Sequence, residues 1–89
     1  MRSVRTTKQF KKDVKRLKKQ GKNFEKLKIV INALCEGANL EEKYRDHKLT
    51  GGFQPARECH IEPDWLLIYE LTPEAVKLRR TGSHSDLFK

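Results

Sequence analysis

The spacing of apolar residues changes once along this 89-residue chain, and that change constrains the fold most strongly. In the first third they recur at helical spacing: Phe10, Val14 and Leu17 form one stripe, and a longer stripe runs through residues 24–34. After a polar stretch, residues 37–46, the pattern becomes short apolar runs separated by turn residues. We therefore expect an α+β protein in which helices precede a sheet.

Capping and stop residues set the expected boundaries. Thr7 is suited to cap a helix over residues 8–20 that stops at Gly21, and Asn23 is suited to cap a second helix that ends at Gly37. The expected strands are 2–6, 47–50, 56–61, 65–71 and 75–81, and the turns between the last four are Gly51-Gly52, Glu62-Pro63 and Thr72-Pro73-Glu74. The sequence thus predicts a helical hairpin packed on a small antiparallel sheet of four to five strands.

Length and apolar content limit the class of protein. A chain of 89 residues holds one small core, so we expect a single domain over residues 1–89. The longest apolar run, residues 65–69, is far shorter than the ~20 residues that span a bilayer, so no membrane role is expected. Cys35 and Cys59 stand in no paired motif, which indicates a reducing, cytoplasmic setting.

Basic residues are concentrated in the helical part. Residues 1–28 hold 12 basic and 2 acidic residues, whereas residues 29–89 hold 8 and 10. Lys11, Lys12 and Lys15 belong to a run of seven cations within twelve positions of the first expected helix. Such a face binds phosphate-rich RNA through salt-dependent contacts, and an acidic protein can use it as well. The structural interpretation of the same pattern is a solvated helix face.

All three histidines lie in the strand-forming part, each near an expected strand end. If the last four strands form a meander, the start of the first, the Glu62-Pro63 turn and the end of the last meet at the same end of the sheet. That end collects His47, His60, Asp64, Trp65, Arg80 and His84. The topology therefore predicts a cluster of three imidazoles, a carboxylate, a guanidinium and an indole.

Three segments carry a family resemblance: Asp46-His47-Lys48-Leu49, residues 57–69 and residues 80–88. In the identity and spacing of these residues, and in the order of elements, nearly the whole chain resembles the YafQ-like toxins of the RelE/ParE superfamily. The resemblance implies a RelE-like fold and the toxin of a bacterial type II toxin–antitoxin system. It also implies a ribosome-dependent endoribonuclease that cuts messenger RNA in the 30S A site. A cognate antitoxin would hold it inactive, and the complex would repress its own operon by binding operator DNA.

The resemblance also implies roles for the clustered residues. His47, His60, Asp64 and His84 would form the acid–base set, with His84 the general acid and either His60 or Asp64 the general base. RNA cleavage without metal needs a base for the 2′-hydroxyl, an acid for the departing 5′-oxygen and stabilisation of the phosphorane charge. Arg80 offers a cationic fork for that charge. No metal and no cofactor are expected.

Substrate contacts are expected outside the acid–base set. Trp65 and Phe88 would stack on unpaired bases, and Lys11, Lys12 and Lys15 would dock on ribosomal RNA. Trp65 also suits a buried core position, and Phe88 suits a terminal plug against the sheet.

Two other functions fit the same fold. Toxins of the ParE branch inhibit DNA gyrase, which does not require the set of histidines and aspartate. A non-catalytic nucleic-acid-binding protein or corepressor would use only the basic helices, and its histidines would be incidental. Arg80 by itself also suits a structural bridge to Glu58 or Glu70 on the sheet. A zinc site built from Cys59 and the histidines is disfavoured, because Cys59 and His60 point to opposite faces of one strand.

Overall fold

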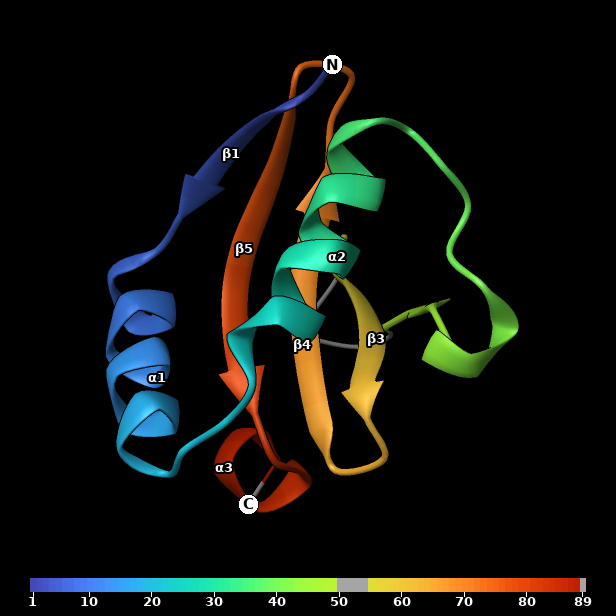
Figure 1. Cartoon of the computed structure of the whole chain (residues 1–89). Helices are drawn as coiled ribbons and strands as arrows, with labels where there is room; N and C mark the ends of the chain where they lie inside the picture. Colours follow the sequence, from blue (N-terminus) through green and yellow to red (C-terminus); the bar gives the residue numbers. More distant parts are fainter. Residues whose placement is uncertain (50–54, 89) are drawn as a thin grey trace.

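The computed structural model describes residues 1–49 and 55–88. Two helices cover one face of a five-stranded sheet, with a short 3-10 helix between the second of them and the last four strands and a short α-helix at the C-terminal end (Figure 1). The elements are β1 (Ser3–Thr6), α1 (Lys8–Lys19), α2 (Phe24–Cys35), η1 (Glu42–Tyr44), β2 (His47–Lys48), β3 (Arg57–Glu62), β4 (Trp65–Leu71), β5 (Ala75–Gly82) and α3 (His84–Leu87). The expected α+β class, with a first strand and two helices before the last four strands, is confirmed.

The helix boundaries follow local chemistry. The Thr7 hydroxyl accepts the Phe10 N–H at 3.0 Å at the start of α1, and Asn23 accepts the Glu25 N–H at 3.1 Å at the start of α2. After α1, Gly21 takes a positive φ of 75°, a conformation that glycine adopts without a steric penalty. The two helices run in opposite directions in Figure 1, as a helical hairpin requires.

The sheet has the order β1-β5-β4-β3-β2. Strands β2 to β5 form the expected antiparallel meander, whereas β1 lies parallel to β5 at the edge, so the sheet is mixed and not wholly antiparallel. A four-residue strand carries no signal for its direction. Long-range hydrogen bonds decide it: the Ser3 N–H donates to the Glu74 carbonyl at 2.9 Å and the Thr7 N–H to the Leu78 carbonyl at 3.2 Å.

Two other expectations concern the first meander strand and its neighbours. Within the described residues β2 covers only His47–Lys48, and the last residue of the predicted strand, residue 50, and the predicted Gly51-Gly52 turn lie outside the described residues. The short helices η1 and α3 were not predicted, because neither is long enough to show an apolar period.

Strand alternation divides β3 between two environments. Cys59 and Ile61 pack with the helices in the hydrophobic core, whereas Glu58 and His60 point to the other face.

No helix in the described part of the chain is long and apolar enough to cross a membrane.

A buried carboxylate joins α1 to β5. Asp13 has no exposed surface, and its oxygens accept bonds from Arg80 Nε at 2.9 Å, Arg80 Nη2 at 3.1 Å, Arg16 Nη1 at 2.9 Å and the Thr81 N–H at 3.1 Å. Burial by itself raises the pKa of Asp13, but the hydrogen bonds from Arg80, Thr81 and Arg16 together outweigh it and lower the pKa below its ordinary value. The ionised side chain therefore holds the helix against the end of the last strand.

We expect Asp13→Ala to lower the free energy of unfolding by about 3 kcal/mol at pH 7, because it strips partly buried cations of their acceptor. The contribution of the carboxylate is present above the unfolded-chain pKa of about 4 and is lost as the pH falls through the lower folded pKa. Urea unfolding at pH 7 and pH 3 measures this. Wild type should lose more stability on acidification than Asp13→Ala does. Glu74→Ala, which removes an exposed acid, is the control, and an Asp13→Ala protein as acid-sensitive as that control would contradict the account.

Candidate active site

His60 stands near the end of β3, on the face of the sheet opposite the helices. Its Nδ1–H donates to the Pro63 carbonyl at 3.3 Å, and its Nε2 lies 3.4 Å from Glu58 Oε1. The turn into β4 supplies the first contact, and the alternation of β3 supplies the second, because residues two apart on a strand share a face. The bond to the Pro63 carbonyl keeps the proton on Nδ1 and fixes the ring orientation, and the Glu58 carboxylate lies beside Nε2.

His47 approaches the same carboxylate from β2. Its Nδ1–H donates to the Arg45 carbonyl at 2.8 Å, and its Nε2 lies 3.6 Å from Glu58 Oε1. In the sheet register His47 pairs with Glu58, not directly with His60. Glu58, only 6% exposed, thus stands between two imidazoles. We did not predict Glu58 as a site residue, although its spacing from His60 was a usable signal.

Asp64 and His84 form a second pair. Asp64, in the β3–β4 turn, accepts the His84 backbone N–H at 3.0 Å and the His84 ring Nδ1–H at 2.7 Å through the same oxygen, Oδ1. The backbone bond and then the ring bond hold the pKa of Asp64 below its ordinary value. Because Nδ1 is engaged, the His84 ring presents Nε2 away from Asp64.

The short helix α3 places His84. Ser83 and Asp86 form a reciprocal capping box at its N-terminus, and Arg16 of α1 lies 3.3 Å from the Asp86 carboxylate. The chain after β5 is therefore folded back against α1. In this arrangement the ring centroids of His84 and His60 are 5.7 Å apart. The predicted gathering of three histidines and Asp64 is present in the structure.

Arg80 and Trp65 occupy positions that differ from their expected roles. Two N–H groups of Arg80 donate to the buried Asp13, so the Arg80 guanidinium faces α1 and is not directed toward the position expected for a substrate phosphate. Neither Glu58 nor Glu70, the partners considered from sequence, takes this place. Trp65 has no exposed surface, and its Nε1–H donates to Thr81 Oγ1 at 2.8 Å. A base cannot stack on it there, and its alternative interpretation as a core residue fits the structure.

The remaining predicted contacts lie on the surface. Phe88, at the C-terminal end of α3, is 37% exposed and its N–H donates to the His84 carbonyl at 2.8 Å, so it lies within one turn of His84. Lys11, Lys12 and Lys15 are exposed on α1, which packs against β5. Helix α1 belongs to the layer that covers the core face of the sheet, whereas His60 points to the opposite face.

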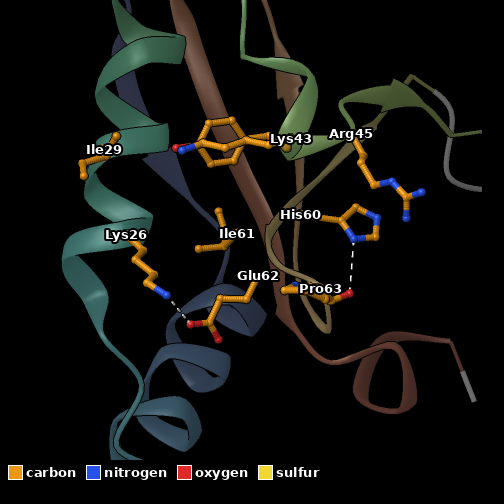
Figure 2. Close-up of a pocket in the computed structure, with 9 residues that line it drawn as sticks. Lys26, Ile29, Lys43, Arg45, His60, Ile61, Glu62 and Pro63 are labelled. Atoms are coloured by element: carbon orange, nitrogen blue, oxygen red, sulfur yellow. Dashed lines mark hydrogen bonds and ion pairs between the residues drawn. The ribbon is translucent and has the colours of Figure 1, made fainter.

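A pocket of about 590 Å³ opens beside the cluster, between α2, η1 and the β3–β4 turn. Figure 2 shows Ile29 and Lys26 on one side and Arg45 and His60 on the other. His60 therefore belongs both to the histidine cluster and to the wall of this pocket.

Histidine and cysteine side chains are the usual ligands of zinc. Among the described residues, no three histidine, cysteine, aspartate or glutamate side chains are grouped so as to hold an ion. Cys59 is fully buried in the core, and burial raises the pKa of its thiol. It faces away from His60, which removes the only thiol that the sequence offered for a zinc site here.

The Asp64–His84 contact gives a measurable titration. In His84→Ala the pKa of Asp64 should rise part of the way to its ordinary value, because the ring bond is lost while the backbone N–H remains. Carbon-detected NMR of the Asp64 carboxyl against pH reports this shift. Ser85→Ala, an exposed change in the same helix, should leave the titration unchanged. A carboxyl that titrates identically in wild type and His84→Ala would show that the ring contact is not formed.

Comparison with known proteins gives concordant matches. A relative in Escherichia coli strain K12, the mRNA interferase toxin YafQ, is 40% identical over 88 residues, covering 98% of this chain and 96% of the relative. A chain of the E. coli DinJ–YafQ toxin–antitoxin complex superposes with a TM-score of 0.92 at 39% identity, covering 99% of this chain and 98% of that one.

A metal-bound toxin from Helicobacter pylori is also similar, with a TM-score of 0.92 and 42% identity over 99% of this chain and 100% of that one. The model of the family described as "Bacterial toxin of type II toxin-antitoxin system, YafQ" matches residues 2–89. The fold, the histidine cluster and these matches agree: the chain belongs to the YafQ family of bacterial type II toxins.

Proposed function

We propose that this toxin is an endoribonuclease that cleaves messenger RNA in the ribosomal A site by metal-independent acid–base chemistry. The observation that carries the proposal is the juxtaposition of two histidine–carboxylate pairs, His60 with Glu58 and His84 with Asp64, whose rings lie 5.7 Å apart. The mRNA interferase name of the E. coli relative supports RNA as the substrate, and it favours cleavage over gyrase inhibition or simple binding.

In the proposed reaction, neutral His60 is the general base. Its proton sits on Nδ1, bonded to the Pro63 carbonyl, so Nε2 is available to take the 2′-hydroxyl proton, and Glu58 then stabilises the imidazolium. The 2′-oxygen attacks phosphorus as the bond to the 5′-oxygen breaks. Protonated His84 donates its Nε2 proton to that 5′-oxygen. The products are a 2′,3′-cyclic phosphate and a 5′-hydroxyl.

Asp64 then acts as the positioning residue of the acid, not as the base. It holds Nδ1–H of His84 and stabilises the charged ring, in the way that a carboxylate orients a catalytic imidazole. His47, turned toward Glu58, supports the other pair from the far side. Arg80 contributes by anchoring the end of β5, from which α3 and His84 continue.

The family and the charge distribution support the partners that we propose. A cognate antitoxin is proposed because a chain of the same fold comes from the DinJ–YafQ complex. The exposed lysines of α1 are proposed to dock on ribosomal RNA, while Phe88, beside His84, stacks on a base of the message. We further propose that the toxin reaches operator DNA only within the antitoxin complex, in the cytoplasm.

His84→Ala should lower the cleavage rate about 10²–10⁴-fold, because the 5′-oxygen loses its proton donor. Primer extension on messages from a translation extract measures the cuts, and Ser85→Ala is the matched control in the same short helix. The variant should also fail to arrest growth while still binding antitoxin. Cuts that persist at the wild-type rate in His84→Ala would refute the acid role.

The same extract also tests whether cleavage is independent of metal. Because a related H. pylori toxin is metal-bound, the extract is also treated with a transition-metal chelator that leaves magnesium in place. The cut rate should not change. A rate lost to the chelator and restored by one metal would replace acid–base cleavage with a metal-assisted mechanism.

Lys11/Lys12/Lys15→Glu should weaken ribosome binding about 10–100-fold at low salt and flatten its salt dependence, because phosphate contacts release counterions. Sedimentation with ribosomes over a salt series measures both quantities.

The matched control, Arg5/Lys28/Lys77→Glu, makes the same change of net charge at exposed positions away from that face of α1. It should retain most of the affinity. Equal losses in the two triple variants would show that total charge, and not the α1 surface, governs docking.

A further inference from the structure

Arg45, next to the histidine cluster, has an unusual backbone. It is the only residue other than glycine with a positive φ in the described part of the chain, with a φ of 51° and a ψ of 42°. A side chain in this left-handed region crowds its own backbone, so glycine or asparagine is the usual occupant. Such a conformation persists only where the surrounding structure imposes it, and conformations of this kind cluster at functional sites.

The surroundings impose this conformation. The Arg45 N–H donates to the Glu42 carbonyl at 2.9 Å, and its own carbonyl accepts the His47 ring N–H at 2.8 Å. The next residue, Asp46, accepts two bonds of 3.2 Å from Arg57 and a further bond from the Tyr69 hydroxyl. The segment that carries Arg45 is therefore clamped to β3 and β4.

Three cations line the pocket, and Arg45 is the one whose charge is available to bind a ligand. Of the other two, Lys26 donates to Glu62 at 2.8 Å, and Lys43 lies 3.4 Å from Glu41 and 5.1 Å from the Tyr44 ring centroid. Among the described residues, no carboxylate pairs with the exposed Arg45 guanidinium. Figure 2 shows its side chain on the same side of the pocket as the His60 ring.

The pocket is open on the side of the sheet edge. In the described part of the chain, β2 pairs only with Arg57 and Glu58, so the His60–Glu62 edge of β3 faces the pocket without a neighbouring strand. Its wall includes apolar surface from Ile29, which is 59% exposed, and from Tyr44, Ile61 and Pro63. A volume of about 590 Å³ is within the usual range for a small-molecule or nucleotide site.

We propose that this pocket is a nucleotide subsite, in which Arg45 holds the phosphate that His60 and His84 act on and the apolar wall takes the flanking base of the unpaired RNA. The inference rests on the proposed ribonuclease function. It supplies the phosphate-binding cation that Arg80, bonded to Asp13, does not provide. A guanidinium matches two phosphate oxygens at once, and a base needs only a flat or apolar partner surface.

The test uses Arg45→Gly, which removes the side chain while suiting the left-handed backbone. Cleavage of a defined message on ribosomes should lose about 100-fold in kcat/KM, which is the usual effect of removing one donor to transition-state charge. Arg45→Lys should lose less, about 10-fold, because the charge remains but the fork is lost. Arg5→Ala, an exposed arginine on the far edge strand β1, should stay within about twofold of wild type.

Two further readouts separate ligand binding from folding. The melting temperature of Arg45→Gly should be at or above that of wild type, so a loss of activity cannot come from unfolding. Ile29→Asp, at an exposed position of the pocket wall, should raise KM about 10-fold with kcat nearly unchanged, because it disturbs base binding and not proton transfer.

Three results would overturn the subsite. Wild-type kcat/KM in Arg45→Gly, with an active wild-type protein, would remove Arg45 from the site and leave the proposed ribonuclease intact. Loss of antitoxin affinity alone in the Arg45 and Ile29 variants would assign the pocket to the antitoxin. If wild type itself made no cuts, the ribonuclease proposal would fail, and the subsite that rests on it would fail with it.

Discussion

The buried carboxylate of Asp13 is the contact on which the site depends. It faces Arg80 and Thr81 on β5 and Arg16 on its own helix, so one anion fixes the position of α1 on the last strand. An ionised group with no solvent exposure is tolerable only because these donors replace its water. Arg16 then continues to Asp86, which caps α3. The position of His84 thus follows from a polar network that begins in the protein interior.

The sheet contributes the other half of the site through strand alternation. The side of β3 that faces the helices is apolar and carries the core, while the opposite side carries Glu58 and His60. The carboxylates of the two histidine–carboxylate pairs differ in exposure: Glu58 is almost completely buried, whereas the Asp64 side chain is 68% exposed. Different surroundings for similar groups are what an acid–base pair with divided roles requires.

Local sequence signals predicted most of the fold. Thr7, Asn23 and Gly21 marked helix ends because capping and positive φ depend on neighbouring residues only. The consecutive turns predicted the meander, and with it the meeting of the histidines at one end. The direction of β1 was not predictable, because it depends on partners about seventy residues away. The helices η1 and α3 were too short to show a period.

By itself, the sequence determined the class of fold, the separation of basic helices from a histidine-bearing sheet, and the family. These are properties of residue type and short-range spacing. The tertiary structure decided which side chains are available for chemistry. It buried Trp65, bonded Arg80 to Asp13, placed Glu58 between two histidines and left Arg45 beside the pocket. Availability depends on burial and on the nearest opposite charge, and both are set by residues distant in sequence.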